Sequence, residues 1–579
     1  MIRSCSPLPG LVATGYRPRW AFPVILSLFL IAGGPAGARD LPPPAREEIV
    51  MGITQFPHTF HPNINSMLAK SYLLGFVMRP ITVHGLDWQI RCMMCTELPS
   101  FDNGLAQRTT RKDGSTGMKI TYRLADWAVW GDGRPVTTKD VLFTWRAGSH
   151  PESGVSNFEL YKRITDIEVV DDKTFTMHID RVSFDYAAIN DFMLLPAHLE
   201  KPAFEKPAEY RNRTLYDTDI TNPGLFNGPY VITDVQPGAQ IVMERNPHWR
   251  KTPGPFGRIV VRVIENTAAL EANLRSGAVD YIPGELGLSI DQALAFEKRF
   301  GADFNIVYKP GLIYEHIDLN LDTPILADRR VRRALLHGID RVAISEQLFG
   351  GHQPVAHSFV NSSDWIYTED VRRYRFDPAR ARALLEEAGW RVGPEGIRHN
   401  ARGEKLGLEL MTGTGSRIRE LVQQVLQSQW RDIGVETRIR NLPPRVMFGE
   451  ITNQRKFTGG VMFAWFTAPE NVPRTILHSE MIPSEENGWG GQNFTGFSHP
   501  EMDRLIDETE TELDPARRKE NWVRMQQIYA EELPVLPLYY RANVFIFPKW
   551  LGNVQPTGHQ YSTSLWVETW RVLSPGGTD

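Results

Sequence analysis

An apolar run near the start of the chain constrains it most, because it predicts that the folded protein begins only after this run. The run spans residues 21–32, follows arginines, and is followed by Ala-Gly-Ala at 36–38. A basic start, a short apolar core and an A-x-A site are typical of a cleaved secretory signal peptide. A membrane-spanning helix needs about 20 apolar residues, and this run is shorter and contains Pro23. We therefore expect residues 1–38 to be a signal peptide and the exported remainder to have no membrane anchor.

Composition narrows the class of protein. The chain has 64 Lys and Arg residues against 68 Asp and Glu residues, without a long block of one sign. That balance argues against nucleic acid or an anionic membrane surface as a partner. Its 579 residues exceed the size at which a single core stops growing, so we expect two or three domains or lobes.

Two cysteines follow the signal segment, Cys92 and Cys95. In an exported protein a disulfide between them is the ordinary interpretation. A redox-active Cys-x-x-Cys, a metal site and free thiols are the alternatives. No thioredoxin-like β-α-β pattern surrounds the pair, and two thiolates alone make an incomplete metal site. We therefore expect a possible disulfide rather than a metal centre.

The predicted elements change character along the chain. Residues 83–215 form a strand-rich unit, in which 166–179 is typical of a hairpin. From about residue 222, strands alternate with helices, and a helix capped by Asn266 ends at Gly277 between two strands, which is typical of an α/β lobe.

The C-terminal half repeats this alternation. An amphipathic pattern predicts one helix over 328–348, and further helices begin after Asp377 and after Asp514. The chain ends in two predicted strands, 536–540 and 544–547.

Five segments together resemble the extracellular solute-binding proteins of family 5, the peptide- and nickel-binding group that serves ABC importers. They occur in the family's order and cover nearly all of the exported chain. They are the Trp-Gly-Asp-Gly segment 124–141, Asn-Gly-Pro-Tyr at 227–230 with 244–249, the turn 274–280, Asn320 with 331–341, and 377–390.

The resemblance implies an α/β, two-lobed periplasmic-binding-protein (Venus-flytrap) fold with an extra strand-rich domain inserted in the first lobe. Lobe I would comprise 39–82, 216–312 and 541–579, the inserted domain 83–215, and lobe II 313–540. The resemblance also implies a periplasmic monomer that captures a solute between its lobes and delivers it to an inner-membrane ABC permease with its ATPase.

The resemblance places two segments in the cleft, with core packing or an ordinary loop as the alternative for each. A set of further residues lies near the expected lobe boundary or in polar loops. The expected ligand-binding residues are Asn63, Asn65, Ser66, Met67, Trp465, Phe466 and Thr467, with Tyr314, Trp489 and Asn493 as weaker candidates.

One position departs from the family's peptide binders. In those proteins an Asp often lies three residues after the equivalent of Trp465 and anchors the peptide's α-ammonium group. Here that position is Ala468, with Glu470 nearby. This departure counts against recognition of a free peptide amino end and favours a non-peptide ligand held by rings and amides. A peptide is the family's default ligand, and an opine, a sugar conjugate, a metal chelate or haem is the alternative.

Other classes of function have weaker support in the residues. The chain has no G-x-S-x-G or H-E-x-x-H motif, so we expect no enzyme, although an exported hydrolase or a periplasmic chaperone is an alternative. His58 and His61 are spaced as H-x-x-H, but a metal needs more ligands than two. We therefore expect no cofactor.

Overall fold

The computed structural model describes residues 46–574. The predicted signal peptide, 1–38, lies outside these residues. None of the described helices is both long enough and apolar enough to cross a membrane. Below, the inserted domain means residues 83–215 and the second lobe means residues 313–540, the ranges predicted from the sequence.

The first lobe is built on a mixed four-stranded sheet in the order β1-β10-β9-β8. β1 pairs in parallel with β10, whereas β9 is antiparallel to both of its neighbours. The central residues of these strands are buried, as expected for strands covered on both faces. The strands are β1 (Glu48–Ile53), β8 (Tyr230–Gln236), β9 (Gln240–Arg245) and β10 (Arg258–Val263), and the helices of this lobe are α1 (Leu68–Val77), α7 (Thr267–Arg275) and α8 (Ile290–Phe300).

The inserted domain has an antiparallel sheet in the order β4-β5-β7-β6 and its own apolar core. The expected hairpin over 166–179 is present as β6 and β7. Its strands are β4 (Ala106–Thr110), β5 (Thr116–Arg123), β6 (Ile164–Val169) and β7 (Thr174–Ile179), with helices α2 (Thr138–Ser149), α3 (Phe158–Arg163), α4 (Ala197–Glu200) and α5 (Pro207–Arg213). α6 (Leu215–Thr218) follows these helices. β2 (Thr82–His84) and β3 (Ile90–Cys92) form a small antiparallel ribbon where the chain enters the inserted domain.

The second lobe has a five-stranded sheet in the order β15-β14-β16-β11-β17. β14 is parallel to both neighbours, and β11 is antiparallel to β16 and β17. Its strands are β11 (Phe304–Leu319), β14 (Gly407–Met411), β15 (Glu436–Ile439), β16 (Gly460–Phe466) and β17 (Val535–Pro548). Its longer helices are α10 (Arg329–His337), α11 (Arg341–Phe349), α12 (Pro378–Glu387), α13 (Arg417–Asp432), α16 (Pro500–Thr511) and α17 (Pro515–Glu532).

The described chain also contains short α-helices and strands. They are α9 (Pro324–Ala327), β12 (Arg391–Val392), β13 (Arg398–His399), α14 (Pro444–Val446), α15 (Arg474–Leu477), β18 (Leu551–Gly552) and β19 (Arg571–Val572).

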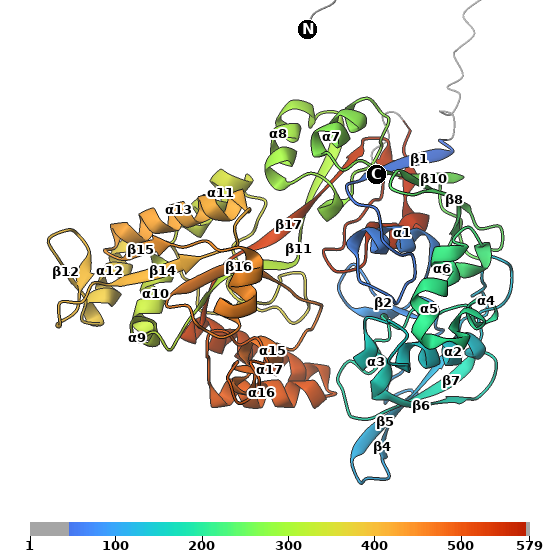
Figure 1. Ribbon diagram of the computed structural model, residues 1–579, viewed down its shortest axis with the longest axis horizontal. Helices are drawn as coiled ribbons and strands as arrows, with labels where there is room; N and C mark the ends of the chain where they lie inside the picture. Colours follow the sequence, from blue (N-terminus) through green and yellow to red (C-terminus); the bar gives the residue numbers. More distant parts are fainter. Residues whose placement is uncertain (1–45, 575–579) are drawn as a thin grey trace, which may run out of the picture. The chain divides into compact units, whose positions relative to one another are not determined.

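β11 and β17 connect the two lobes (Figure 1). One end of this pair contributes Val544 and Ile546 to a core with α7 and α8. The other end contributes Ile317 and Leu536 to the core of the second lobe. The pairing is irregular between Pro310 and Tyr314, between the two cores. A long two-stranded ribbon with an irregular centre is a physical candidate for a hinge, because fewer ladder bonds resist bending there.

The Trp-Gly-Asp-Gly segment has a structural role. Asp140 forms a capping box with Thr137 at the start of α2. The same carboxylate accepts hydrogen bonds from the Trp130 indole at 3.3 Å and from the Ala197 backbone at 2.9 Å. It thereby joins a turn, a helix and a loop, which explains why this residue type stands in the motif.

The single helix expected over 328–348 is wrong, because the structure has two helices, α10 and α11. Gly338 ends the first, and the Asp340 carboxylate begins the second by accepting a hydrogen bond from the Ala343 backbone at 2.9 Å. The apolar spacing continues across this break, so periodicity alone did not indicate it.

Two expectations for strands also need correction. The strands expected at 536–540 and 544–547 form one strand, β17, because β11 pairs with both parts. The strand expected after α7 is reduced to isolated bridges, Met51 with Tyr281 and Ile282 with Ile546.

Candidate functional site

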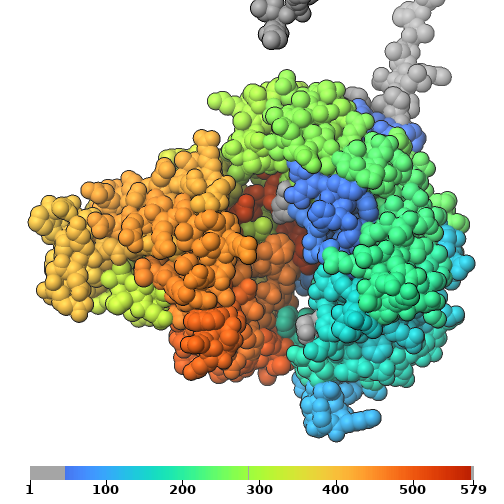
Figure 2. All heavy atoms as spheres, in the orientation of Figure 1, coloured from blue at the N-terminus to red at the C-terminus, as the bar shows by residue number. Residues whose placement is uncertain are grey.

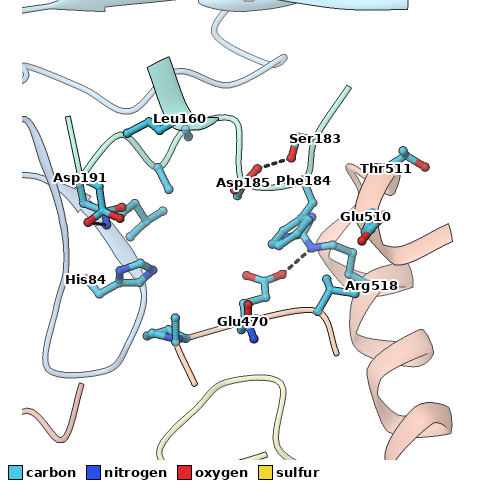
Figure 3. A pocket seen from close by; sticks show the side chains of 18 of the residues that line it. His84, Leu160, Ser183, Phe184, Asp185, Asp191, Glu470, Glu510, Thr511 and Arg518 are labelled. Atoms are coloured by element: carbon cyan, nitrogen blue, oxygen red, sulfur yellow. Dashed lines mark hydrogen bonds and ion pairs between the residues drawn. The ribbon is translucent and has the colours of Figure 1, made fainter. Parts of the chain in front are cut away.

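A cavity of about 1270 Å³ lies between the inserted domain and the second lobe. In Figure 2 an opening separates the orange surface from the blue and teal one, and Figure 3 shows the lining side chains. One wall consists of residues between His84 and Asp191. The other consists of Trp365, 468–472 and residues between Glu510 and Arg518.

A second cavity of about 330 Å³ adjoins the first. It lies against the loop before α1 and along the length of that helix. The two cavities share four lining residues, all of them polar: Asn157, Asn190, Asp191 and Gln560. The volumes together exceed the roughly 300–1,000 Å³ of ordinary small-molecule pockets.

The second-lobe wall carries a carboxylate whose charge is compensated. Glu470 accepts hydrogen bonds from the Arg518 guanidinium at 2.6 Å and from the Trp365 indole at 3.1 Å. Burial raises the pKa of Glu470, and the Arg518 guanidinium opposes that rise. Glu470 has a positive φ of 52°, and its backbone N–H donates to Asp364 at 2.8 Å. The carboxylate is therefore fixed within its own wall.

The inserted-domain wall carries a carboxylate without such compensation. Among residues 46–574, no basic side chain forms an ion pair with Asp191, and the hydrogen bond found for its carboxylate comes from the Asn190 amide at 3.2 Å. The side chain is open to the cavity but enclosed by protein, and this desolvation raises its pKa. The hydroxyl of Tyr161 is buried without a hydrogen-bond partner, and after burial the charge of Asp191 is the second cause that raises its pKa.

Basic groups also line the larger cavity, so this wall carries both signs. Arg181 pairs with Asp180 at 2.7 Å. The buried Nε of Arg163 has no hydrogen-bond partner among the described residues. His84 is neutral at pH 7, because burial lowers its pKa to about 4, and its ring stacks on Tyr561 with centroids 6.3 Å apart.

The two walls touch at Phe184. Its backbone N–H donates to the Glu510 carbonyl at 3.1 Å, and the Arg518 guanidinium lies 5.5 Å from its ring centroid. Figure 3 shows Phe184 projecting beside Arg518. Arg518 thus contacts the opposite wall while it compensates Glu470.

The structure brings the first predicted binding segment to a cavity. Asn63, Asn65, Ser66 and Met67 all line the smaller cavity. Asn63 already donates to the Met193 carbonyl at 2.8 Å, and Asn65 accepts from Arg211 at 3.0 Å. Whether they contact a ligand stays a prediction.

Buried Lys70, which the sequence reading missed, organises this loop. Its ammonium donates to the carbonyls of His61 at 2.7 Å and Ile64 at 2.6 Å, and also to Asn65. Burial lowers its pKa to about 8. The only advance signal is a lysine within an otherwise apolar helical pattern.

The second predicted segment lies beside the larger cavity rather than in it. Trp465 and Phe466 end β16 and Thr467 follows it, but the lining begins at Ala468. Trp465 stacks on Phe494 at 6.2 Å, and the Thr467 hydroxyl donates to the Leu312 carbonyl at 3.1 Å. Phe466 is 60% exposed.

The three weaker candidates line neither cavity. Tyr314 and Asn493 are buried, and the Asn493 amide donates to the carbonyls of His478 and Phe497. Trp489 lies in a loop with a positive φ of 62°. In this structure Tyr314 and Asn493 are therefore core residues, because both side chains are buried among neighbouring residues.

The cysteine pair and His61 have structural roles. Cys92 and Cys95 form a disulfide. Both ring nitrogens of buried His61 have partners, the Tyr210 hydroxyl at 3.0 Å and the Asn63 backbone at 3.1 Å. Among residues 46–574 no group of three or more His, Cys, Asp or Glu side chains is arranged to hold a metal ion.

Comparisons with known proteins agree with this architecture. The model of the bacterial extracellular solute-binding proteins, family 5, matches residues 100–480. The oligopeptide-binding protein AppA of Bacillus subtilis is 23% identical over 478 residues, which are 80% of this chain and 82% of that protein.

Solved structures are similar over almost their full length. The oligopeptide-binding protein of Thermus thermophilus, complexed with a pentapeptide, has a TM-score of 0.65 and 29% identity, covering 92% of this chain and 98% of that one. NikZ of Campylobacter jejuni, complexed with Ni(L-His), has a TM-score of 0.65 and 19% identity over 91% and 99%.

The fold and the cleft define a two-lobed solute-binding protein. The chain belongs to the bacterial extracellular solute-binding proteins, family 5. This confirms the resemblance and the two-lobed α/β fold, and it identifies a binding protein rather than an enzyme.

Proposed function

We propose that this protein captures a peptide between the inserted domain and the second lobe and delivers it to an ABC permease. The observation that carries the proposal is the cavity of about 1270 Å³, lined by both parts of the chain. Such a volume exceeds that of common small-molecule pockets and suits a ligand longer than one amino acid. Arg163 and Asp191 line the same wall and suit a ligand that carries both charges.

Delivery depends on a difference between liganded and ligand-free forms. A ligand that contacts both walls favours the closed arrangement, because only that arrangement supplies all of its contacts. The β11–β17 ribbon supplies the flexible connection, with its irregular pairing between Pro310 and Tyr314. The permease, with its ATPase, then recognises the closed form.

The same proposal includes the cell compartment and the oligomeric state. Signal-peptide cleavage near Ala38 would release the chain into the periplasm as a monomer. The disulfide between Cys92 and Cys95 suits an oxidising compartment. The domain boundaries at 83, 216, 313 and 541 belong to the proposal as well.

A peptide is favoured over a metal chelate by two observations. The solved structure with the higher identity is described with a pentapeptide, and the described residues contain no metal-holding group. Because the solved structure of NikZ is described with Ni(L-His), a metal chelate is the alternative outcome of the test below.

The test is to identify what the protein carries. The exported protein is purified without added ligand, denatured, and the released small molecules are identified by mass spectrometry. A series of peptides is the expected result, and calorimetric titration of the refolded protein with those peptides should show binding without turnover. Release of a single metal chelate, opine or sugar conjugate would contradict the peptide proposal.

A further inference from the structure

A carboxylate at the junction of two cavities has no cation of its own. Asp191 lines both the larger and the smaller cavity. One oxygen accepts a hydrogen bond from the Asn190 amide, and no hydrogen bond is found for the other among the described residues. Asp191 is exposed to the cavity and has no cation of its own among the described residues, so its charge is open to a cationic partner from outside.

The other carboxylates of this cavity differ in their surroundings. Glu470 is paired with Arg518 at 2.6 Å, and Glu510 is paired with Arg474 at 2.7 Å. Asp185 is exposed, as Asp191 is, but it accepts a hydrogen bond from the Ser183 hydroxyl. Asp185 lines only the larger cavity, whereas Asp191 lines both.

The groups around Asp191 suit an ammonium group. Asn157, Asn190 and Gln560 line the same junction, and amide oxygens accept the remaining N–H donors of such a group. The Tyr161 hydroxyl, which has no partner among the described residues, lies within the electrostatic reach of Asp191. In Figure 3 Asp191 and His84 lie on one side of the cavity, away from the Glu470–Arg518 pair.

We propose that Asp191 binds the primary ammonium group of the ligand and makes a free amino group the feature that this protein selects. The inference rests on the proposed peptide function, because it assigns the amino end of the peptide to the junction of the cavities. Ala468 has no charge to offer, and Glu470 is already compensated. The ammonium anchor is then on the inserted-domain wall rather than on the second lobe.

The experiment compares two probes on three proteins. The probes are a mixture of random tetrapeptides without basic side chains and the same mixture with acetylated amino ends. The proteins are the wild type, Asp191→Asn and Asp185→Asn, each stripped of ligand and checked by circular dichroism and thermal unfolding. Affinities are measured by calorimetric titration.

Acetylation is expected to weaken binding to the wild type by about 10- to 100-fold, the usual range for a hydrogen bond between charged groups. In Asp191→Asn the free and acetylated mixtures should bind within about twofold of each other. Asp185→Asn should retain the discrimination of the wild type, because in this proposal the ammonium group contacts the carboxylate of Asp191 and not that of Asp185.

The outcomes separate the two proposals. If the free and acetylated mixtures bind the wild type equally well, or if Asp191→Asn still discriminates, the assignment of Asp191 is overturned while the peptide function stands. An equal loss of discrimination in both variants would indicate a long-range effect of charge and would also overturn it. If neither mixture binds the wild type, the peptide function fails and the anchor fails with it.

Discussion

The two walls of the cleft each carry a carboxylate, and the surroundings of the two carboxylates differ. Glu470 has a guanidinium and an indole as partners within its own lobe, whereas Asp191 has one amide and no cation among the described residues. A compensated charge belongs to the scaffold, because its interactions are already made inside the wall. An uncompensated one is available to a ligand. The comparison teaches that nearness to a cleft does not by itself make an acidic residue a binding residue.

The largest effect is expected where compensation is removed. Arg518→Met leaves Glu470 enclosed without its cation and should lower the free energy of unfolding by about 3–5 kcal/mol. Arg517→Met, at an exposed neighbouring position, should change it by less than about 0.5 kcal/mol. Urea denaturation at pH 7 measures both. A small loss of unfolding free energy in Arg518→Met would mean that Glu470 does not need Arg518. Glu470 would then be as available to a ligand as Asp191, which would contradict the contrast between the two walls.

The next effect concerns pH. Burial raises the pKa of Asp364, which holds the Glu470 backbone, to about 6. The folded form therefore binds the proton more tightly than the unfolded form, so stability falls as pH rises through 6. Asp364→Asn removes this cost and should exceed the wild type by about 2 kcal/mol at pH 7.

That difference should shrink as the pH is lowered to about 4, near the ordinary pKa of an aspartate. Urea denaturation across this range checks it, with Asp370→Asn, exposed on the same segment, as the control variant. A difference that stays constant with pH would contradict the assignment to Asp364.

A smaller effect is expected at the contact between the walls. Phe184→Ala removes the ring beside the Arg518 guanidinium, an interaction of about 1 kcal/mol. The population of open forms should rise roughly fivefold, which small-angle X-ray scattering of the ligand-free protein would detect as a larger radius of gyration. Val170→Ala, at an exposed position of the same domain, should leave the scattering unchanged. An unchanged radius in Phe184→Ala would show that this contact does not hold the walls together.

The smallest effect is also the sharpest contrast with Arg518. Asp191→Asn breaks no ion pair found among the described residues. It also removes a carboxyl group whose pKa is raised by desolvation. Its free energy of unfolding at pH 7 should therefore stay within about 0.5 kcal/mol of the wild type or lie slightly above it. Urea denaturation measures the change, and a loss of several kcal/mol would show that Asp191 is part of the scaffold after all.

The resemblance motifs predicted the fold better than the site, because most of them are scaffold. Arg332 and Arg341, both in the matched segments, donate to buried backbone carbonyls, including those of Leu326 and Pro537. Gly228 lets the chain approach the end of α1, where a side chain would meet the Val77 carbonyl carbon at 2.5 Å. Such residues identify a family because they hold its backbone, and they say little about its ligand.

Candidate site residues were harder to predict. Trp465 was expected in the cleft from the family resemblance and Tyr314 from its place near the lobe boundary, yet Tyr314 packs in the core of the second lobe. Asn190, Asp191 and Gln560 carry no motif of their own. They line the same junction of the two cavities only because the inserted domain and the C-terminal segment meet there.

The residues in order were enough to predict the family, the alternation of strands and helices, a possible pairing of Cys92 with Cys95, and the absence of an Asp at position 468. These follow from local patterns and from residue types in order. Only the tertiary structure decided which acidic residues are neutralised. Glu470 and Arg518 are 48 positions apart, and their distance in space depends on how β16 and α17 pack. Charge compensation acts over a few ångströms between side chains, so chain order alone does not specify it.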